Sequence, residues 1–184
     1  MRRFYAPPEN FRGDKILLET EQTRHLRDVL RLREGANVNV FDGAGAEFSC
    51  VIEKIGKSET ILEILEKVNP RAPESDLDLS LAVALLKGEK FDLVVQKAVE
   101  LGVNILIPLK TARADVKIKD AKDAARKVER RRRIALEAAK QCGRARLMKI
   151  ELPLAFEEFV KNSATPSDET FVFFSERGGA DFVA

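Results

Sequence analysis

The chain has 184 residues, of which 45% are hydrophobic and 34% charged, and its formal net charge is +2. These values are typical of a soluble globular protein with one or two domains, and they exclude a disordered chain. No apolar stretch approaches the roughly 20 residues of a membrane-spanning helix, so we expect no membrane partner. Two distant cysteines, Cys50 and Cys142, and a single histidine argue against a disulfide framework and a metal site. They favour a reducing, cytoplasmic location.

The first part of the chain, residues 1–70, is predicted to be a small β-rich domain with one helix. Alternating or apolar runs predict short strands at 1–5, 15–19, 37–41, 47–55 and 60–68. The sequence Asp-Gly-Ala-Gly at 42–45 is typical of a hairpin turn. Several short strands around one hairpin indicate a small barrel. The proline-rich and charged segment 68–76 is interpreted as the linker to a second domain at 71–184. The basic N-terminus is followed by no apolar region, so we expect no signal peptide.

The predicted helix of the first domain spans residues 20–35, with Thr20 as its cap and Gly35 at its end. At α-helical spacing the side that faces the core is formed by Leu26, Val29 and Leu30. Three arginines share the opposite side and could bracket successive phosphates: Arg24, Arg27 and Arg31. We interpret this ridge as a nucleic-acid contact. The alternative is an ordinary solvated surface, which more often mixes the signs of its charges.

The second domain begins with a β-α-β pattern. An apolar strand at 77–86, expected to be covered on both faces, leads into Lys87-Gly88, and a helix begins at Phe91. A second apolar strand follows at 105–109, which implies a right-handed crossover and a parallel sheet. On the polar side of the helix, Glu100 is interpreted as the structural partner of Lys97. Ligands of such sheets lie beyond the carboxyl ends of the strands, yet no GxGxxG, Walker A or Ser-His-Asp order identifies the chemistry.

A long basic helix is predicted over residues 120–142, ended by Gly143. Its inward stripe is expected to include Val128, Arg132, Ala135 and Ala139. Strands at 147–152 and 170–175, a helix at 154–160 and a turn at 176–179 are predicted to follow.

Positive charge is concentrated in one segment of the chain. Residues 110–149 contain fifteen Lys or Arg against five Asp or Glu, whereas the rest of the chain has a net charge of −8. This asymmetry favours a local basic surface for a polyanion, with nucleic acid first among the candidates. The alternative is a solvated helix whose charges are paired.

Five stretches, taken together, resemble one enzyme family: HLRDVLRLREG, FDGAGAEF, KGEKFDLVVQKAVELGV, PLKTAR and EAAKQCGRAR. They are similar, in the same order, to the RsmE type of ribosomal RNA methyltransferase. That family methylates N3 of a uridine in the 16S rRNA of the small ribosomal subunit, with S-adenosylmethionine as cofactor. The resemblance implies an α/β protein in which a PUA-like β-barrel domain precedes a SPOUT-type domain with a parallel sheet and a knot. It also implies a homodimer.

Family members continue with a glycine-rich loop and a further segment, which together form most of the cofactor pocket and the knot. Neither is found in these 184 residues. We therefore expect the chain to correspond to the N-terminal part of such an enzyme, with an incomplete second domain and weak cofactor binding. The alternative is a non-catalytic module that binds rRNA.

The resemblance also implies roles for single residues. Arg113 and Arg144 are candidate catalytic residues, because an arginine beside the reacting uridine can stabilise its deprotonated N3. The candidate cofactor-binding residues are Phe174, Ser175 and Glu176. The candidate RNA-binding residues are Arg2, Arg3, Arg24, His25, Arg27, Arg31, Lys87 and Gln141. The general base that removes the N3 proton is left open.

Overall fold

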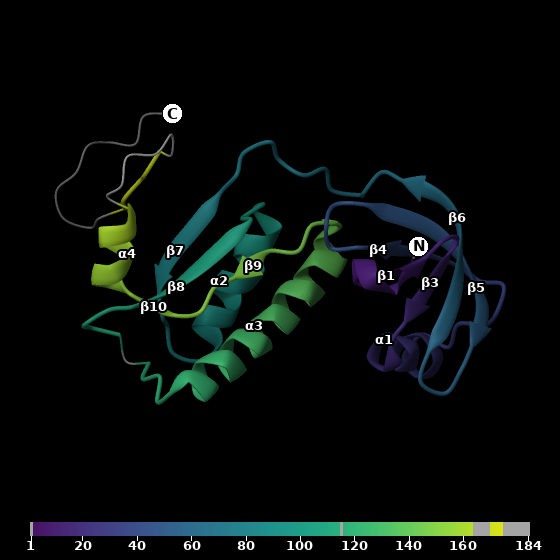
Figure 1. The fold of residues 1–184 in the computed structure, drawn as a ribbon, viewed down its shortest axis with the longest axis horizontal. Coiled ribbons are helices and arrows are strands. Elements are labelled where there is room, and N and C mark those ends of the chain that lie inside the picture. Colours follow the sequence, from purple (N-terminus) through teal and green to yellow (C-terminus); the bar gives the residue numbers. More distant parts are fainter. Residues whose placement is uncertain (1, 115, 164–169, 175–184) are drawn as a thin grey trace.

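Two β-sheets, built from separate parts of the chain, organise the molecule into two lobes (Figure 1). The computed structural model describes residues 2–114, 116–163 and 170–174. Residues 69–79 connect the lobes, between the last strand of the first sheet and the first strand of the second.

The first lobe is an open, curved six-stranded sheet in the order β1-β4-β5-β6-β3-β2 (Figure 1). Its strands are β1 (Arg3–Tyr5), β2 (Phe11–Arg12), β3 (Lys15–Leu18), β4 (Asn37–Phe41), β5 (Glu47–Ile55) and β6 (Thr60–Val68). β1 and β4 pair in parallel, and the other neighbours pair antiparallel. The five predicted strands are confirmed here, and their buried apolar side chains form the core of this lobe; β2 was not predicted. A short 3-10 turn, η1 (Pro8–Asn10), precedes β2.

The helix of this lobe differs from its prediction. α1 (Thr20–Arg24) continues into a π-helical turn, η2 (His25–Val29), in which the Leu30 amide donates to the His25 carbonyl at 2.9 Å. The N-cap position is occupied by Glu19, and the helix ends at Leu30, before Gly35. The wider π turn changes which residues share a side of the helix. Leu26 is therefore buried as predicted, but Val29 is 67% exposed.

The second lobe contains a parallel sheet in which β8 (Ile105–Lys110) is central. β7 (Ser80–Ala84) pairs on one side of it, and β9 (Lys149–Ile150) and β10 (Leu154–Ala155) pair in succession on the other. The helices are α2 (Glu89–Glu100), α3 (Ala121–Cys142) and α4 (Phe156–Ser163). The predicted β-α-β unit and the long basic helix are thus confirmed.

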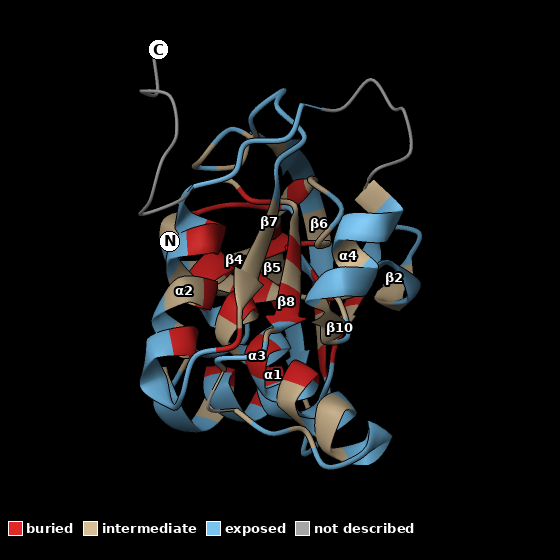
Figure 2. Cartoon of the chain, turned by 90° about the vertical axis from the view of Figure 1, so that its left-hand side faces the viewer, coloured by how far each residue is buried: buried red, intermediate tan, exposed pale blue. Residues whose placement is uncertain are grey.

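α2 and α3 pack together over the sheet and form the core of this lobe (Figure 2). Phe91, Val95 and Val99 of α2 are buried. The buried residues of α3 are Val128, Arg131, Ala135, Ala138 and Ala139, which is a helical stripe. The inward arginine is therefore Arg131, and the prediction of Arg132 was wrong by one position.

Other predictions for this lobe need correction. β7 was expected to be covered on both faces, but it is an edge strand and residues 81–84 are only half-buried. The predicted strand at 147–152 has only two residues in β9, and the helix expected at 154–160 begins after the short strand β10. The described part of the strand expected at 170–175, Thr170–Phe174, forms no strand. Ser175 and the turn predicted at 176–179 lie outside the described residues.

Arg3 joins the two lobes. Its guanidinium binds the Glu47 carboxylate at 2.8 Å within the first lobe, and donates to the Ala139 and Arg144 carbonyls of the second at 2.9 and 3.1 Å. It also stacks on the Phe41 ring, 4.6 Å from the centroid. The prediction that Arg3 faces RNA differs from this structure, because its side chain is only 10% exposed and its donors are occupied.

Candidate nucleic-acid interface

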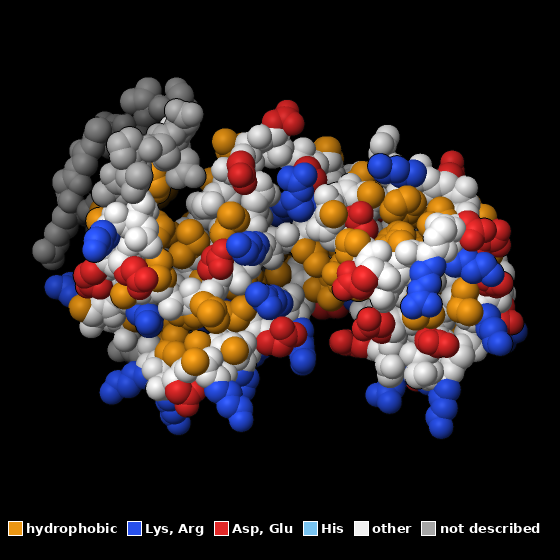
Figure 3. Space-filling model, viewed as in Figure 1, with side chains coloured by type: hydrophobic (Ala, Val, Ile, Leu, Met, Phe, Trp, Pro, Cys, Tyr) orange, Lys and Arg blue, Asp and Glu red, His pale blue; other side chains and the backbone are white. Residues whose placement is uncertain are grey.

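α3 is the most basic helix of the second lobe. The helix contains eight Lys or Arg residues and three Asp or Glu residues. Figure 3 shows Lys and Arg side chains projecting along the edge of this lobe where Figure 1 draws α3, and others projecting from the same edge of the first lobe, near α1. Two lobes that present cations on one side can contact one extended polyanion.

Part of this charge is neutralised within the protein. Asp123 accepts from Arg126 and Lys127, each at 2.8 Å. Arg130 forms a bidentate pair with Asp92 of α2. The alternative of a solvated helix with paired charges therefore describes the first half of α3. Arg132 and Arg133 extend the basic surface beyond these pairs. Among the described residues Arg133 pairs with Glu129 alone, at 3.7 Å, and its side chain is 73% exposed.

Gln141 lies in a groove between α2 and α3. The groove has a volume of about 320 Å³ and is lined by Gln96, Arg133, Ile134, Glu137, Ala138 and Gln141. The Gln96 amide and the Lys97 ammonium both donate to Glu100, at 2.9 and 2.6 Å. The expected pairing of Glu100 with Lys97 is thus confirmed, and these hydrogen bonds lower the pKa of Glu100. Gln141 itself is exposed and can contact a ligand in the groove.

The three arginines expected to form one ridge on the first lobe are separated by the π turn. Arg24 is exposed, as is His25, whose ring meets Phe4 edge-on at 6.3 Å. Arg27 donates to Asp28 and to the carbonyls of residues 56 and 57, at 3.3 and 3.0 Å, so its guanidinium holds a loop. Arg31 lies beyond the helix at a φ of 53°. Arg24, His25 and Arg31, with exposed Arg2, remain available to a polyanion.

Arg144 and Arg113 have different surroundings, although both are candidate catalytic residues. Arg144 is 3% exposed. It donates to Glu74 at 2.8 Å and to the carbonyls of Val99 and Val103 at 2.9 and 3.0 Å. It therefore fastens the connecting segment 69–79 to α2, and its donors are occupied. Arg113 is exposed, in the turn that follows β8, at the sheet edge where ligands of parallel sheets lie.

The candidate cofactor residues lie at the end of the described chain. Phe174 is 80% exposed. Ser175 and Glu176 are outside the described residues. The described residues thus include only one of the three candidate cofactor residues, and we derive no step through S-adenosylmethionine.

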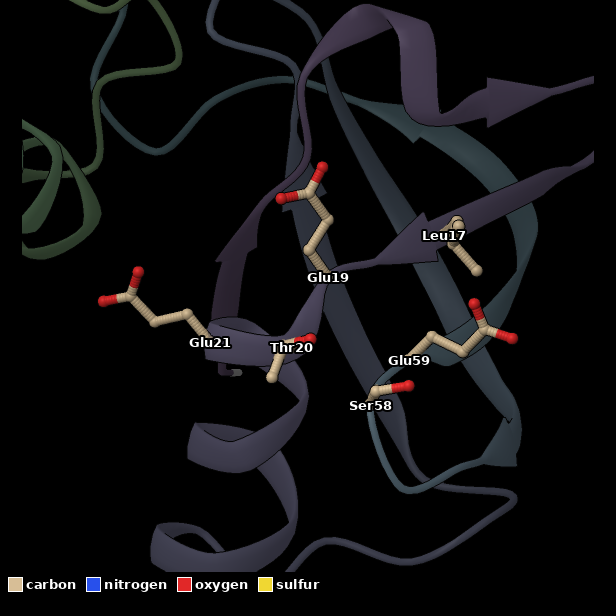
Figure 4. Close-up of a pocket in the computed structure, with 6 residues that line it drawn as sticks. All are labelled: Leu17, Glu19, Thr20, Glu21, Ser58 and Glu59. Atoms are coloured by element: carbon tan, nitrogen blue, oxygen red, sulfur yellow. The ribbon is translucent and has the colours of Figure 1, made fainter.

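A further hollow lies on the first lobe (Figure 4). It has a volume of about 460 Å³ and is lined by Leu17, Glu19, Thr20, Glu21, Ser58 and Glu59. Three carboxylates and no cationic side chain line it, which disfavours a phosphate. Within the described ranges, no cluster of His, Cys, Asp and Glu could hold a metal ion, and no helix is long and apolar enough to cross a membrane.

Sequence reasoning overlooked Arg131, which is buried beside Phe91. The available signal was its spacing, because it follows Val128 by three residues and precedes Ala135 by four. A charged residue on an otherwise apolar stripe identifies a buried charge that needs a partner.

Both lobes match domains of known proteins. Residues 18–65 match the RNA methyltransferase PUA domain, and residues 73–183 match the RNA methyltransferase domain. The chain is 33% identical, over 89% of its length, to the ribosomal RNA small subunit methyltransferase E of Synechocystis, and 30% identical, over 77%, to that of Bacillus subtilis. It spans about half the length of these relatives, 52% and 54% respectively.

Solved structures agree with this assignment. A ribosomal RNA small subunit methyltransferase E from Neisseria gonorrhoeae, bound to S-adenosylmethionine, is 30% identical with a TM-score of 0.80, over 91% of this chain and 67% of that one. A Legionella pneumophila protein in complex with the same cofactor is 34% identical with a TM-score of 0.79, over 88% and 66%.

A PUA-like lobe followed by a SPOUT-type α/β lobe, with exposed cations on both, defines a protein of the RNA-modifying class. The chain belongs to the RNA methyltransferase family represented by ribosomal RNA small subunit methyltransferase E.

Proposed function

We propose that this chain is the RNA-holding part of an enzyme that methylates N3 of a uridine in 16S rRNA with S-adenosylmethionine. The observation that carries the proposal is the match of both lobes, in order, to the two domains of RNA methyltransferases. The cofactor assignment is supported by the two similar structures that contain it. The boundary between the domains is proposed at residues 70 and 71, within the segment that connects the sheets.

The chemistry requires that N3 of the uridine loses its proton before it can accept a methyl group, which the cofactor supplies when bound. The residue of this chain proposed to act on the base is Arg113, because it is exposed at the carboxyl end of β8. Its guanidinium would stabilise the negative charge of deprotonated N3. Arg144 is the weaker candidate, since its donors already bind Glu74 and backbone carbonyls.

RNA is proposed to cross both lobes. On the first lobe the proposed contacts are Arg2, Arg24, His25 and Arg31, and on the second they are Lys87, Gln141, Arg132 and Arg133. Contacts of this kind bind phosphates and position RNA without reading its sequence. A homodimer and a cytoplasmic location are further parts of the proposal. The homodimer is supported by exposed Leu93 on α2 and exposed Leu101 directly after its end, and the location by two free cysteines.

A non-catalytic rRNA-binding module is the second candidate function for these residues. The exposed cations on both lobes favour it, because phosphate contacts of this kind need no cofactor. Calorimetric titration of S-adenosylmethionine distinguishes the two. Saturable binding of S-adenosylmethionine would support the enzyme. If the chain bound rRNA but no S-adenosylmethionine, the non-catalytic module would be supported instead.

The RNA proposal is tested with a charge-reversed surface. We expect Arg132→Glu with Arg133→Glu to lower the slope of log affinity for a 16S rRNA fragment against log salt by about 2, since two phosphate contacts are lost. The matched control is Lys54→Glu with Lys67→Glu, which makes the same charge change on exposed residues of β5 and β6. Equal slopes for the two double variants would contradict the proposal.

A further inference from the structure

A small cavity lies where β7 leads into α2. Its volume is about 240 Å³, and its lining is Leu86, Lys87, Gly88, Phe91, Asp92, Val116, Lys127, Arg130 and Arg131. This is the carboxyl end of a parallel strand, where such sheets bind their ligands. The volume is below the range of roughly 300–1,000 Å³ that is usual for drug-sized molecules, so the cavity suits a small group.

Arg131 is the unusual member of this lining. It is 5% exposed, and its guanidinium lies over the Phe91 ring, 4.1 Å from the centroid. Its Nη1 atom is buried and has no hydrogen-bond partner among the described residues. Burial lowers the pKa of Arg131, while nearby Asp92 opposes that effect. A buried cationic donor without an acceptor is costly, and an oxyanion in the adjoining cavity would supply the acceptor.

The other charges around the cavity leave it positive. Asp92 is already engaged by Arg130 in a bidentate pair. Lys127 donates to Asp123 and to the Lys117 carbonyl, both at 2.8 Å. Lys87 forms no ion pair with the described part of the chain and is exposed at the rim. Among the described residues, neither Lys87 nor Arg131 therefore forms an ion pair with a carboxylate.

The backbone adds donors at the same place. α2 begins after Gly88, whose φ of 62° and ψ of −138° turn the chain into the helix, and no side chain caps this end. The first amides of a helix have no intrahelical acceptor and carry partial positive charge, which favours an anion. A side chain added at Gly88 would meet no atom within 4 Å, so space beside this backbone is open. Glu89 and Asp92 lie in the first turn of α2, but only Asp92 lines the cavity.

We propose that this cavity binds one phosphate group of the RNA, held by Arg131, Lys87 and the first backbone amides of α2. The assignment to RNA rests on the function proposed above, whereas the phosphate chemistry rests on the cavity itself. Because a bound phosphodiester would sit at the carboxyl edge of the sheet, it would position the neighbouring nucleotide near Arg113 and the turn after β8. Arg131 and Lys87 are thus positioning residues.

The test uses the full 184-residue chain and two probes, inorganic phosphate and a 16S rRNA fragment. Phosphate binding is followed through the amide chemical shifts of Gly88, Glu89 and Lys90. We expect saturable shifts that are lost in Lys87→Gln and in Arg131→Met. We also expect each variant to weaken RNA binding about tenfold and to lower its salt slope by about 1. Lys90→Gln is the matched control, because Lys90 is exposed on the same turn but does not line the cavity.

The phosphate site and its assignment to RNA can be contradicted separately. Absence of saturable shifts in the unmodified chain would overturn the phosphate site. Saturable phosphate binding with unchanged RNA affinity in both variants would overturn the RNA assignment and give the cavity to a small phosphorylated molecule. If the chain bound no RNA fragment, the proposed function would be contradicted. The amide chemical-shift changes caused by inorganic phosphate would still test whether the cavity binds phosphate. If urea denaturation of Arg131→Met shows no cooperative transition, that variant is not properly folded. Lys87→Gln, at an exposed position, then provides the test.

Discussion

Arginine takes two opposite roles in this molecule, and single residues show the difference. Arg3, Arg131 and Arg144 lie within the protein, where Arg3 and Arg144 bind carboxylates and backbone carbonyls. Arg132 and Arg113 are exposed. The planar guanidinium, with five donors, can form two parallel hydrogen bonds either with a buried carboxylate or with a phosphate. Residue type alone therefore does not identify an RNA-binding arginine. What distinguishes Arg3 and Arg144 is that protein acceptors already occupy their donors, whereas Nη1 of Arg131 has no acceptor among the described residues.

Gly143 shows how strictly one position can be constrained. It ends α3 with a φ of 94°, and a Cβ added there would lie 2.9 Å from the Cβ of Arg71 in the connecting segment. We expect Gly143→Ala to lower the free energy of unfolding by about 2 kcal/mol, through backbone strain and this close contact. Urea denaturation measures the change.

The control for that substitution is Gly13→Ala, at a φ of 64° with no atom within 4 Å of the added Cβ. It tests backbone strain without the close contact, so we expect a loss of only about 1 kcal/mol. Equal losses in the two variants would show that the approach of Arg71 costs nothing.

At the scale of the element, the basic helix α3 is capped at both ends and has one buried side and one cationic side. Asp120 caps its first turn by accepting the Asp123 amide at 2.7 Å, and Gly143 closes its end. One side of the helix is buried against α2, and the other presents cations. α1 is the opposite case, because its π turn moves Val29 to the surface and separates the arginines that α-helical spacing would align.

Asp123 gives α3 an acid-sensitive first turn. Hydrogen bonds from Lys127 and then Arg126 hold the pKa of Asp123 well below its ordinary value of 3.8. Because the folded pKa is depressed, the unfolded chain takes up the proton first as the pH falls. The stabilisation by Asp123 is therefore complete above about pH 4 and is lost progressively below it.

The expected result is a smaller acid-induced loss of stability in Asp123→Asn than in the unmodified chain. Free energies of unfolding in urea, compared from about pH 5 down to about pH 2, measure this difference. Parallel curves for the two proteins would mean that Asp123 does not contribute to the acid sensitivity.

At the scale of the whole molecule, the two lobes are held in register by a small set of buried contacts. Arg3 links β1 and β5 to the end of α3. Phe41 of the first sheet belongs to the core of the second lobe, and the Leu147 amide donates to the Gly43 carbonyl at 2.9 Å. A fixed relation between the lobes is what one RNA molecule contacting both would require.

Glu47→Gln tests this junction. The Glu47 side chain is 2% exposed and accepts from Arg3 and from the Asn39 amide, at 2.8 and 2.9 Å. Removing its charge leaves Arg3 buried without its carboxylate, so we expect a loss of about 3 kcal/mol in the free energy of unfolding. Urea denaturation again provides the measurement.

Glu53→Gln is the control for the junction, since it removes a carboxylate from the exposed pair with Lys15, whose side chains are 48% and 41% exposed. Exposed pairs contribute little, and we expect a change within about 0.5 kcal/mol. A similar small change in Glu47→Gln would contradict a role for the buried pair in stability.

The sequence by itself determined five of the six strands of the first lobe, the β-α-β unit, the basic helix and its end at Gly143. These features follow from local periodicity, turn residues and caps, which act over a few neighbours. The family was also within reach of the sequence, because its motifs recur in order along the chain. The knot and the dimer implied by that resemblance stay predictions.

Only the tertiary structure decided which of the basic residues are free. Arg3 and Arg144 were expected at the RNA and the active region, yet each lies buried against partners distant in the sequence, Glu47 and Glu74. Arg131 instead of Arg132 faces the core, and the strand expected at residues 170–175 does not form in its described part. Burial and pairing depend on which distant segments fold together, and no local pattern of residues encodes those long-range contacts.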